Sequence, residues 1–127
     1  VRHWMHQEMV RMDGEKMSKS LGNLVFVSDL LAEYDPRAVR LLLLAHHYRD
    51  SWEWDPKQVD EADERLRRWV QAADRDADAA LEQVRTALDD DLDTAAAVRA
   101  VDEGAVAGEG VSAAAALLGV DLRAHVG

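Results

Sequence analysis

Two lysines and two serines lie within one short segment of the chain, and their types and spacing suit the binding of a polyphosphate. The segment reads Lys16-Met17-Ser18-Lys19-Ser20. A lysine ammonium binds phosphate as a movable point charge, and serine hydroxyls can donate hydrogen bonds to phosphate oxygens. Gly14 and Gly22 flank the segment and permit the tight turns that such a loop needs. We therefore predict a phosphate-binding loop; a solvated surface loop is the alternative.

The composition disfavours several classes of protein. The 127 residues carry 15 basic and 25 acidic side chains, for a net charge of −10, and no cysteine. Residues 1–54 hold 7 basic and 8 acidic side chains, whereas residues 55–103 hold 7 and 15. Because so acidic a surface repels a phosphate backbone, we expect no binding of tRNA or other nucleic acid by this chain alone. The lack of cysteine excludes disulfides and thiolate metal sites.

The chain offers no segment suited to a membrane. Its apolar runs, such as residues 41–45, are far shorter than a membrane-spanning helix, and no signal peptide precedes the loop. We expect a cytoplasmic protein. The first residue is Val1, which fits either an alternative start codon or the later part of a longer protein.

The first third of the chain predicts short strands and one short helix. Residues 9–12 followed by Asp13-Gly14 indicate a strand that enters a tight turn and then the loop. The apolar run at residues 24–27 predicts a further strand. Ser28 is a candidate cap for a short helix that reaches Tyr34.

Two aspartate-proline pairs predict the starts of longer helices. Asp35 caps a helix with proline at its first position, and its inward face is expected at Val39, Leu42, Leu43 and His46. Asp55 starts another helix, in which Gln58 completes a capping box. The apolar stripe of that helix comprises Val59, Ala62, Leu66, Trp69, Val70 and Ala73.

The rest of the chain also predicts helices. Apolar spacing continues through residues 77–88, and the acidic run at residues 89–91 ends that helix and precedes another at residues 92–103. Glycines at 104, 108 and 110 indicate a flexible break. A last helix at residues 112–118 is stopped by glycine.

The predicted fold class is therefore mainly α. A short β/loop segment that carries the lysine loop precedes an α-helical bundle. Trp52, Trp54 and Trp69 are expected in the bundle core, and His46-His47 are expected to pack at a helix end. The acidic run could suggest magnesium, but a solvated helix cap is the preferred interpretation.

The loop and its surroundings resemble a known family. Residues 16–20, continued by Leu21-Gly22-Asn23 and preceded by Trp4-Met5-His6, resemble class I aminoacyl-tRNA synthetases of the cysteine type, whose "KMSKS" loop closes over ATP. The helical half is similar to the mycothiol cysteine ligases, relatives that do not use tRNA. The matching segments are His47-Tyr48-Arg49, Arg65-Leu66, Arg68-Trp69, Asp90-Asp91-Leu92-Asp93-Thr94 and Leu117-Leu118-Gly119-Val120-Asp121-Leu122.

The resemblance implies an ATP-dependent ligation. Such ligases use ATP, with magnesium expected, and join L-cysteine to the amine of a glucosaminyl-inositol through cysteinyl adenylate. The family's zinc is held by cysteine and histidine residues upstream of the loop segment, so no metal ligand is expected here. His3 and His6 have a spacing that could bind metal on a helix, but we reject that interpretation.

The resemblance also implies roles for the two loop lysines. Lys19 would steady the β- and γ-phosphates as pyrophosphate charge develops, and Lys16 would assist it. Both are the catalytic candidates.

Four further residues are candidates for ATP or adenylate binding. Ser18 and Ser20 would position the loop or donate to phosphate oxygens, and Met17 would anchor the loop through apolar contact. Val10 would border the adenylate through its backbone; a plain core valine is the alternative.

The resemblance further implies a site completed by other residues. The His-x-Gly-His type signature of class I enzymes does not occur here, and we expect a Rossmann domain to be lacking. We therefore expect a C-terminal portion, inactive alone, with residues 1–27 ending a nucleotide-binding domain and residues 28–127 forming the helical bundle. A nucleotide-binding domain, in cis or in trans, is the expected partner. The alternatives are the same portion of a cysteinyl-tRNA synthetase and a non-catalytic helical binding module.

Overall fold

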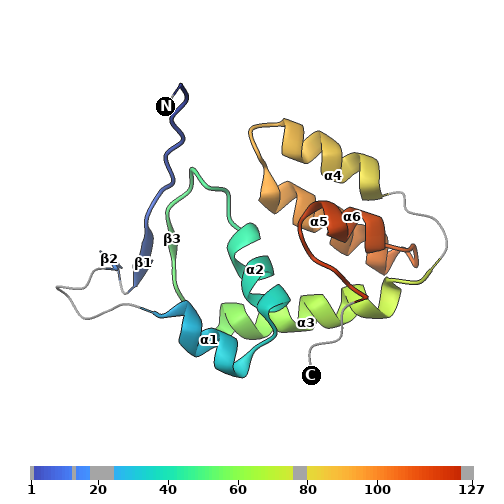
Figure 1. Cartoon of the computed structure of the whole chain (residues 1–127), viewed down its shortest axis with the longest axis horizontal. Helices are drawn as coiled ribbons and strands as arrows, with labels where there is room; N and C mark the ends of the chain where they lie inside the picture. The colour runs from blue at the N-terminus through green and yellow to red at the C-terminus, as the bar shows by residue number, and fades with distance from the viewer. Residues whose placement is uncertain (1, 13, 18–24, 76–79, 124–127) are drawn as a thin grey trace.

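The computed structural model describes residues 2–12, 14–17, 25–75 and 80–123. Within these ranges a small sheet and an extended N-terminal arm (residues 2–9) lie at one end of the molecule, and helices make up the rest (Figure 1). The mainly α class, with a short β segment before a helical bundle, is confirmed.

The sheet is formed by two local strands and one distant strand. Strand β1 (Val10–Met12) pairs antiparallel with β2 (Glu15–Lys16), so the predicted strand and tight turn are confirmed. Gly14 in the turn has a φ of +78°, a conformation that glycine adopts without strain. Strand β3 (Trp52–Glu53) lies parallel to β1 on its other edge, which gives the order β2-β1-β3.

Helix α1 (Val27–Glu33) replaces the strand that the apolar run at residues 24–27 predicted. Val25 and Phe26 precede the helix and Val27 is its first residue; residue 24 lies outside the described ranges. Strand propensity expresses packing against neighbouring strands, and β3 occupies the place beside β1. The cap prediction is also wrong: Phe26 is the N-cap, with no side-chain hydrogen bond, and Ser28 lies inside the helix.

Both aspartate-proline starts are confirmed. Helix α2 (Pro36–Leu44) begins after Asp35, whose carboxylate accepts the Arg37 backbone N–H at 2.9 Å. Helix α3 (Lys57–Ala72) begins beside a reciprocal pair of bonds. The Asp55 carboxylate accepts from the Lys57 N–H at 2.9 Å, and Gln58 Oε1 accepts from the Asp55 N–H at 3.3 Å.

Three more helices complete the bundle. They are α4 (Ala80–Asp89), α5 (Thr94–Val106) and α6 (Ser112–Leu117), and α6 ends before Gly119, whose φ is +76°. The predicted break at Gly104 is wrong, because that glycine lies within α5. A Cβ at Gly104 would stand 3.2 Å from the Cβ of Ala80, so glycine permits a close helix approach there.

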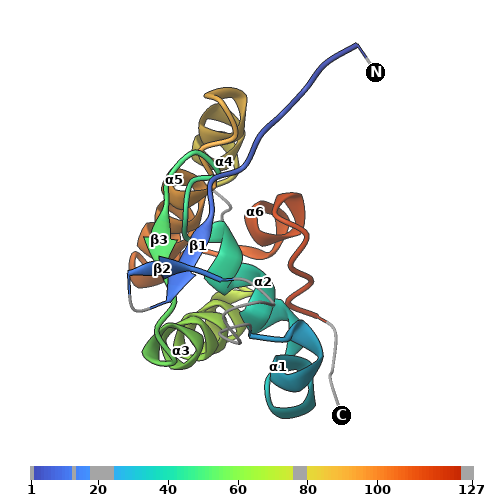
Figure 2. The same ribbon diagram turned by 90° about the vertical axis from the view of Figure 1, so that its left-hand side faces the viewer.

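The core lies between the helices. Helix α2 packs on α3, α4 packs on α5, and α6 packs against α4 (Figure 2). Trp69 is fully buried, as predicted, and its indole N–H donates to Asp102 at 2.7 Å. The inward faces differ from prediction at two positions: Leu43 is 50% exposed and Val70 is 42% exposed. Helix α2 instead buries Ala38 and Leu41 beside Val39 and Leu42.

Trp52 and Trp54, which were also predicted to lie in the core, are only partly buried. They pack against the core from outside, so that prediction is only partly correct. In the described part of the chain, no helix is both long and apolar enough to cross a membrane.

Candidate active site

The hairpin brings three of the predicted site residues together. Val10 begins β1, Lys16 ends β2 opposite Arg11, and the Met17 backbone N–H donates to the Val10 carbonyl at 3.3 Å. Val10 and Met17 are both half-buried. The prediction that Val10 borders an adenylate through its backbone stays a prediction, and one part of that backbone, the carbonyl, helps close the hairpin.

The remaining predicted residues follow directly after the hairpin. Ser18, Lys19 and Ser20 lie outside the described residues, as does the side chain of Lys16. What the structure supplies is therefore the base from which the loop departs. Their roles stay predictions.

Residues 51–54 hold this base to the bundle. The Trp54 backbone N–H donates to the Arg11 carbonyl at 2.6 Å, and Arg11 Nε donates to Ser51 Oγ at 3.0 Å. At the turn, the Gly14 N–H donates to the Glu53 carboxylate at 3.1 Å. The position of the hairpin therefore depends on a segment that follows it by about forty residues in the sequence.

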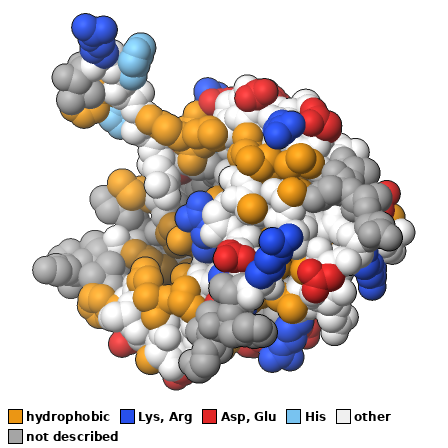
Figure 3. All heavy atoms as spheres, turned by 45° about the vertical axis from the view of Figure 1, so that its right-hand side comes forward, with side chains coloured by type: hydrophobic (Ala, Val, Ile, Leu, Met, Phe, Trp, Pro, Cys, Tyr) orange, Lys and Arg blue, Asp and Glu red, His pale blue; other side chains and the backbone are white. Residues whose placement is uncertain are grey.

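The N-terminal arm leads into β1 and stands away from the bundle, as Figure 3 shows. The Glu8 backbone N–H ties it to the Tyr48 carbonyl at 2.8 Å. Trp4, Met5 and Met9 on the arm are 76%, 59% and 50% exposed. Apolar side chains so exposed are available for contact with another surface.

A cavity of about 320 Å³ lies between the arm and the end of α2. The ring of His46 stacks on Trp52 in its wall, with centroids 3.9 Å apart and planes 3° from parallel. Burial lowers the pKa of His46, which favours the neutral imidazole, while the Asp50 carboxylate opposes that shift. The predicted packing role of His46 is thus confirmed by its stacking. Glu8 and Asp50 line the cavity together with Arg40, so its wall carries acidic and basic side chains.

A polar cluster around Asp91 joins residues 47–49 to the turn between α4 and α5. Asp91 accepts a hydrogen bond from the Tyr48 hydroxyl at 2.6 Å and pairs with the Arg49 guanidinium at 2.8 Å. His47 Nε2 faces the same carboxylate at 3.9 Å. Asp91 was predicted to be part of a solvated helix cap, so this role was missed.

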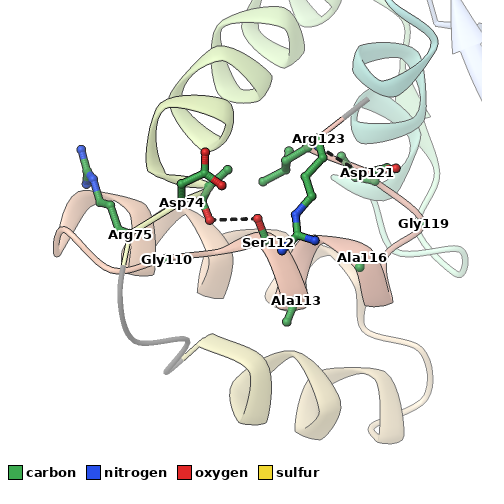
Figure 4. Close-up of a pocket in the computed structure, with 12 residues that line it drawn as sticks. Asp74, Arg75, Gly110, Ser112, Ala113, Ala116, Gly119, Asp121 and Arg123 are labelled. Atoms are coloured by element: carbon green, nitrogen blue, oxygen red, sulfur yellow. Dashed lines mark hydrogen bonds between the residues drawn. The ribbon is translucent and has the colours of Figure 1, made fainter. Parts of the chain in front are cut away.

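A larger cavity, of about 800 Å³, lies elsewhere, at the end of α3 and along α6 (Figure 4). Ser112 Oγ donates to the Ala73 carbonyl at 2.9 Å in its wall. Asp74 and Asp121 line it together with Arg75 and Arg123, so its lining carries both signs of charge. No described residue of the hairpin lines this cavity.

The described part of the chain supplies a support for the lysine-bearing segment. Among the described residues, no group of three or more acidic, histidine or cysteine side chains could hold a metal ion. What the hairpin can do is hold the chain at Met17, directly before the remaining motif residues, at the edge of the bundle.

Sequence reasoning missed the residues that fix the hairpin. Ser51, Glu53 and Asp91 contact partners 39 to 43 positions away in the sequence. Local spacing carries no signal for such contacts. The only available signal was that residues 47–49 and 90–94 both belonged to the segments carrying the family resemblance.

Comparison with known families gives a match to the first half of the chain. Residues 1–64, which include the hairpin, β3 and the first turns of α3, match the model described as "tRNA synthetases class I (C) catalytic domain".

Comparison with individual proteins gives relatives over most of the chain. In Thermobifida fusca, the protein named L-cysteine:1D-myo-inositol 2-amino-2-deoxy-alpha-D-glucopyranoside ligase is 57% identical over 108 residues, which cover 81% of this chain and 26% of the relative. Proteins of the same name from Streptosporangium roseum and Kribbella flavida are each 47% identical, over 96% and 100% of this chain and 34% and 32% of the relatives. The chain thus spans about a quarter to a third of the length of these relatives.

Proposed function

The chain belongs to the class I tRNA synthetase (C) catalytic-domain family, and we propose that it supplies the ATP-closing loop and the helical bundle of an L-cysteine:amino-sugar ligase. The amine acceptor is a glucosaminyl-inositol, and the product belongs to mycothiol synthesis. The single observation that carries this proposal is the identity of 47–57% to proteins named as that ligase over four-fifths or more of the chain.

The proposed reaction has two steps that balance. The cysteine carboxylate attacks the α-phosphorus of ATP, which forms cysteinyl adenylate and releases pyrophosphate. The amino group of the sugar then attacks the acyl carbon, forms the amide and releases AMP and a proton. Lys19 and Lys16 neutralise the charge that develops on the leaving pyrophosphate, an interaction stronger in the transition state than in the bound substrate.

The other loop residues support the lysines in this proposal. Ser18 and Ser20 position the loop or donate to phosphate oxygens, and Met17 anchors its first turn to the hairpin. Val10 borders the adenylate. The hydrogen bond between Met17 and Val10, at 3.3 Å, supports a common place for the two residues at the base of the loop.

We further propose that a nucleotide-binding domain, in cis or in trans, completes the site. Residues 1–27 would end that domain and residues 28–127 would form the bundle beside it. Two observations support this: the relatives are three to four times as long as the matched segment, and the arm exposes Trp4, Met5 and Met9. Burial of such side chains against another domain would stabilise the assembly.

The test uses a hybrid enzyme in which this chain replaces the matching segment of the Thermobifida fusca relative. We expect cysteine-dependent exchange between ATP and pyrophosphate, followed by ligation to the amino sugar. Absence of exchange from a folded hybrid would refute the proposal. Acylation of tRNA in place of the amino sugar would instead identify a cysteinyl-tRNA synthetase.

Substitution in the hybrid then tests the loop. Lys19→Ala should lower the exchange rate about a hundredfold, which corresponds to about 3 kcal/mol of transition-state stabilisation. The matched control is Lys57→Ala, which removes an exposed lysine at the start of α3 and should leave the rate unchanged. Equal rates for Lys19→Ala and the unsubstituted hybrid would favour a non-catalytic binding module.

A further inference from the structure

We infer that Asp91 is a positioning residue: it clamps residues 47–49 to the turn between α4 and α5 and thereby fixes the loop-bearing hairpin against the bundle. This inference rests on the proposed function only for the purpose that the loop serves. The mechanical link itself stands on contacts among described residues.

The first link of the clamp lies on the side of the bundle. One carboxylate oxygen of Asp91 accepts from the Tyr48 hydroxyl at 2.6 Å, and the other meets Arg49 Nη2 at 2.8 Å. The guanidinium of Arg49 also lies 5.8 Å from the centre of the Tyr48 ring. Because the groups share one carboxylate and one ring, they form a network rather than an isolated surface pair, and networks hold geometry better than single exposed pairs.

The turn that presents Asp91 has an unusual backbone. Asp91 and Leu92 both have a φ of +53°, in the left-handed region that residues other than glycine seldom adopt. Backbone bonds close the turn, among them Leu92 N–H to the Leu88 carbonyl at 3.2 Å and Asp93 N–H to the Ala87 carbonyl at 3.0 Å. The contacts of the Asp91 side chain help offset the cost of this conformation.

A second contact joins the same two parts of the chain. Thr94 Oγ1, two residues after the turn, donates to the His46 carbonyl at 3.2 Å. His47 Nδ1 accepts from the Arg49 backbone N–H at 3.1 Å, so in the neutral ring the proton lies on Nε2, which faces Asp91. Thr94 and Asp91 therefore contact opposite ends of residues 46–49.

The last link connects this segment to the hairpin. The Tyr48 carbonyl accepts the Glu8 N–H at 2.8 Å, just before β1, and the chain continues from residue 49 into β3, which pairs with β1. A displacement of residues 47–49 would therefore move both the arm and β3. Asp91 acts on the hairpin through Tyr48 and Arg49, with which its carboxylate is in contact.

Amide hydrogen exchange, measured by NMR on the 127-residue chain, tests the clamp. In Asp91→Gly we expect the Glu8 and Trp54 amides to exchange about fivefold faster, because the exposed network contributes modestly to holding this region. The Ala62 and Val98 amides in the core should keep their rates. Glycine suits a φ of +53°, so this variant removes the carboxylate without adding backbone strain.

Two further variants separate positioning from general stability. Asp90→Gly removes the neighbouring acidic charge and should leave Glu8 and Trp54 unchanged. Asp91→Asn retains an acceptor for the Tyr48 hydroxyl and tolerates the left-handed backbone, so its exchange should be intermediate. Unchanged Glu8 and Trp54 rates in Asp91→Gly, or equal acceleration of every amide, would overturn the inference. The experiment involves no ATP, so its outcome is independent of the proposed function.

Discussion

The hairpin region and the helical bundle are held in place by different forces. Among the described residues, the first buried side chain is that of Ala38, and every residue before it is at least partly exposed. The bundle buries its own core around Trp69, Val84 and Val98. The hairpin instead relies on hydrogen bonds to residues 51–54 and at Glu8. The bundle should therefore resist unfolding, whereas the hairpin should open locally at much lower free energy.

The largest expected effect comes from removing the centre of the bundle. Trp69→Ala should lower the free energy of unfolding by about 3–5 kcal/mol, because it leaves a cavity and removes the indole donor to Asp102. Urea unfolding followed by circular dichroism measures this loss. The control Val70→Ala changes the adjacent residue, which is 42% exposed, and should cost about 0.5 kcal/mol or less. Similar losses for the two variants would contradict the assignment of the core.

Two glycines distinguish packing in the bundle from conformation in the hairpin. Gly104→Val should destabilise the chain by about 1–3 kcal/mol, because a Cβ there would stand 3.2 Å from Ala80 and 3.4 Å from Val111. At Gly14 no atom lies within 4 Å of an added Cβ, so only the φ of +78° restricts which residues the position accepts. Asparagine, which tolerates that φ, should therefore be accepted at position 14. Thermal unfolding of Gly104→Val and Gly14→Asn measures the difference in midpoint temperature. Equal decreases in the two midpoints would contradict the different roles assigned to the two glycines.

The smallest expected effect lies where the two regions meet. The pKa of His46 is lowered by burial, so the unfolded chain binds a proton more readily there than the folded chain. This contribution to stability is complete above about pH 6.5, the ordinary value for histidine, and is lost as the pH falls below it. Urea unfolding at pH 7.5 and 5.5 should show the decrease, and His46→Gln should reduce it. The control His3→Gln, on the exposed arm, should leave the decrease as it was.

Sequence-local rules predicted the starts of α2 and α3 and the hairpin turn, although not the cap of α1. Asp35, Asp55 and Gln58 act as caps because their partners lie two or three residues away. The glycine turn at position 14 is equally local. The errors arose where contacts between residues distant in the sequence decide the local structure. The run at residues 24–27 has strand-forming residues, but Val27 begins a helix. Gly104 lies within a helix and permits the close approach of Ala80 from another helix, instead of marking a break.

The candidate site was predicted only in part, for the same reason. The loop motif itself could be recognised from five adjacent residues, and the structure places Val10, Lys16 and Met17 together at its base. The supports of the hairpin could not be predicted, since Glu53 and Asp91 reach their partners across 39 and 43 positions. Side-chain spacing within one segment contains no information about such partners.

The parallel pairing of β1 and β3 determines how the molecule transmits force. The arm enters β1 at one end of the pair, and the chain leaves β3 for α3 at the other. A pull between the arm and α3 therefore loads the two strands in shear, so that the hydrogen bonds between them share the load instead of breaking one after another. A pull on the arm should consequently reach the long helix through these two strands for as long as the hairpin stays closed.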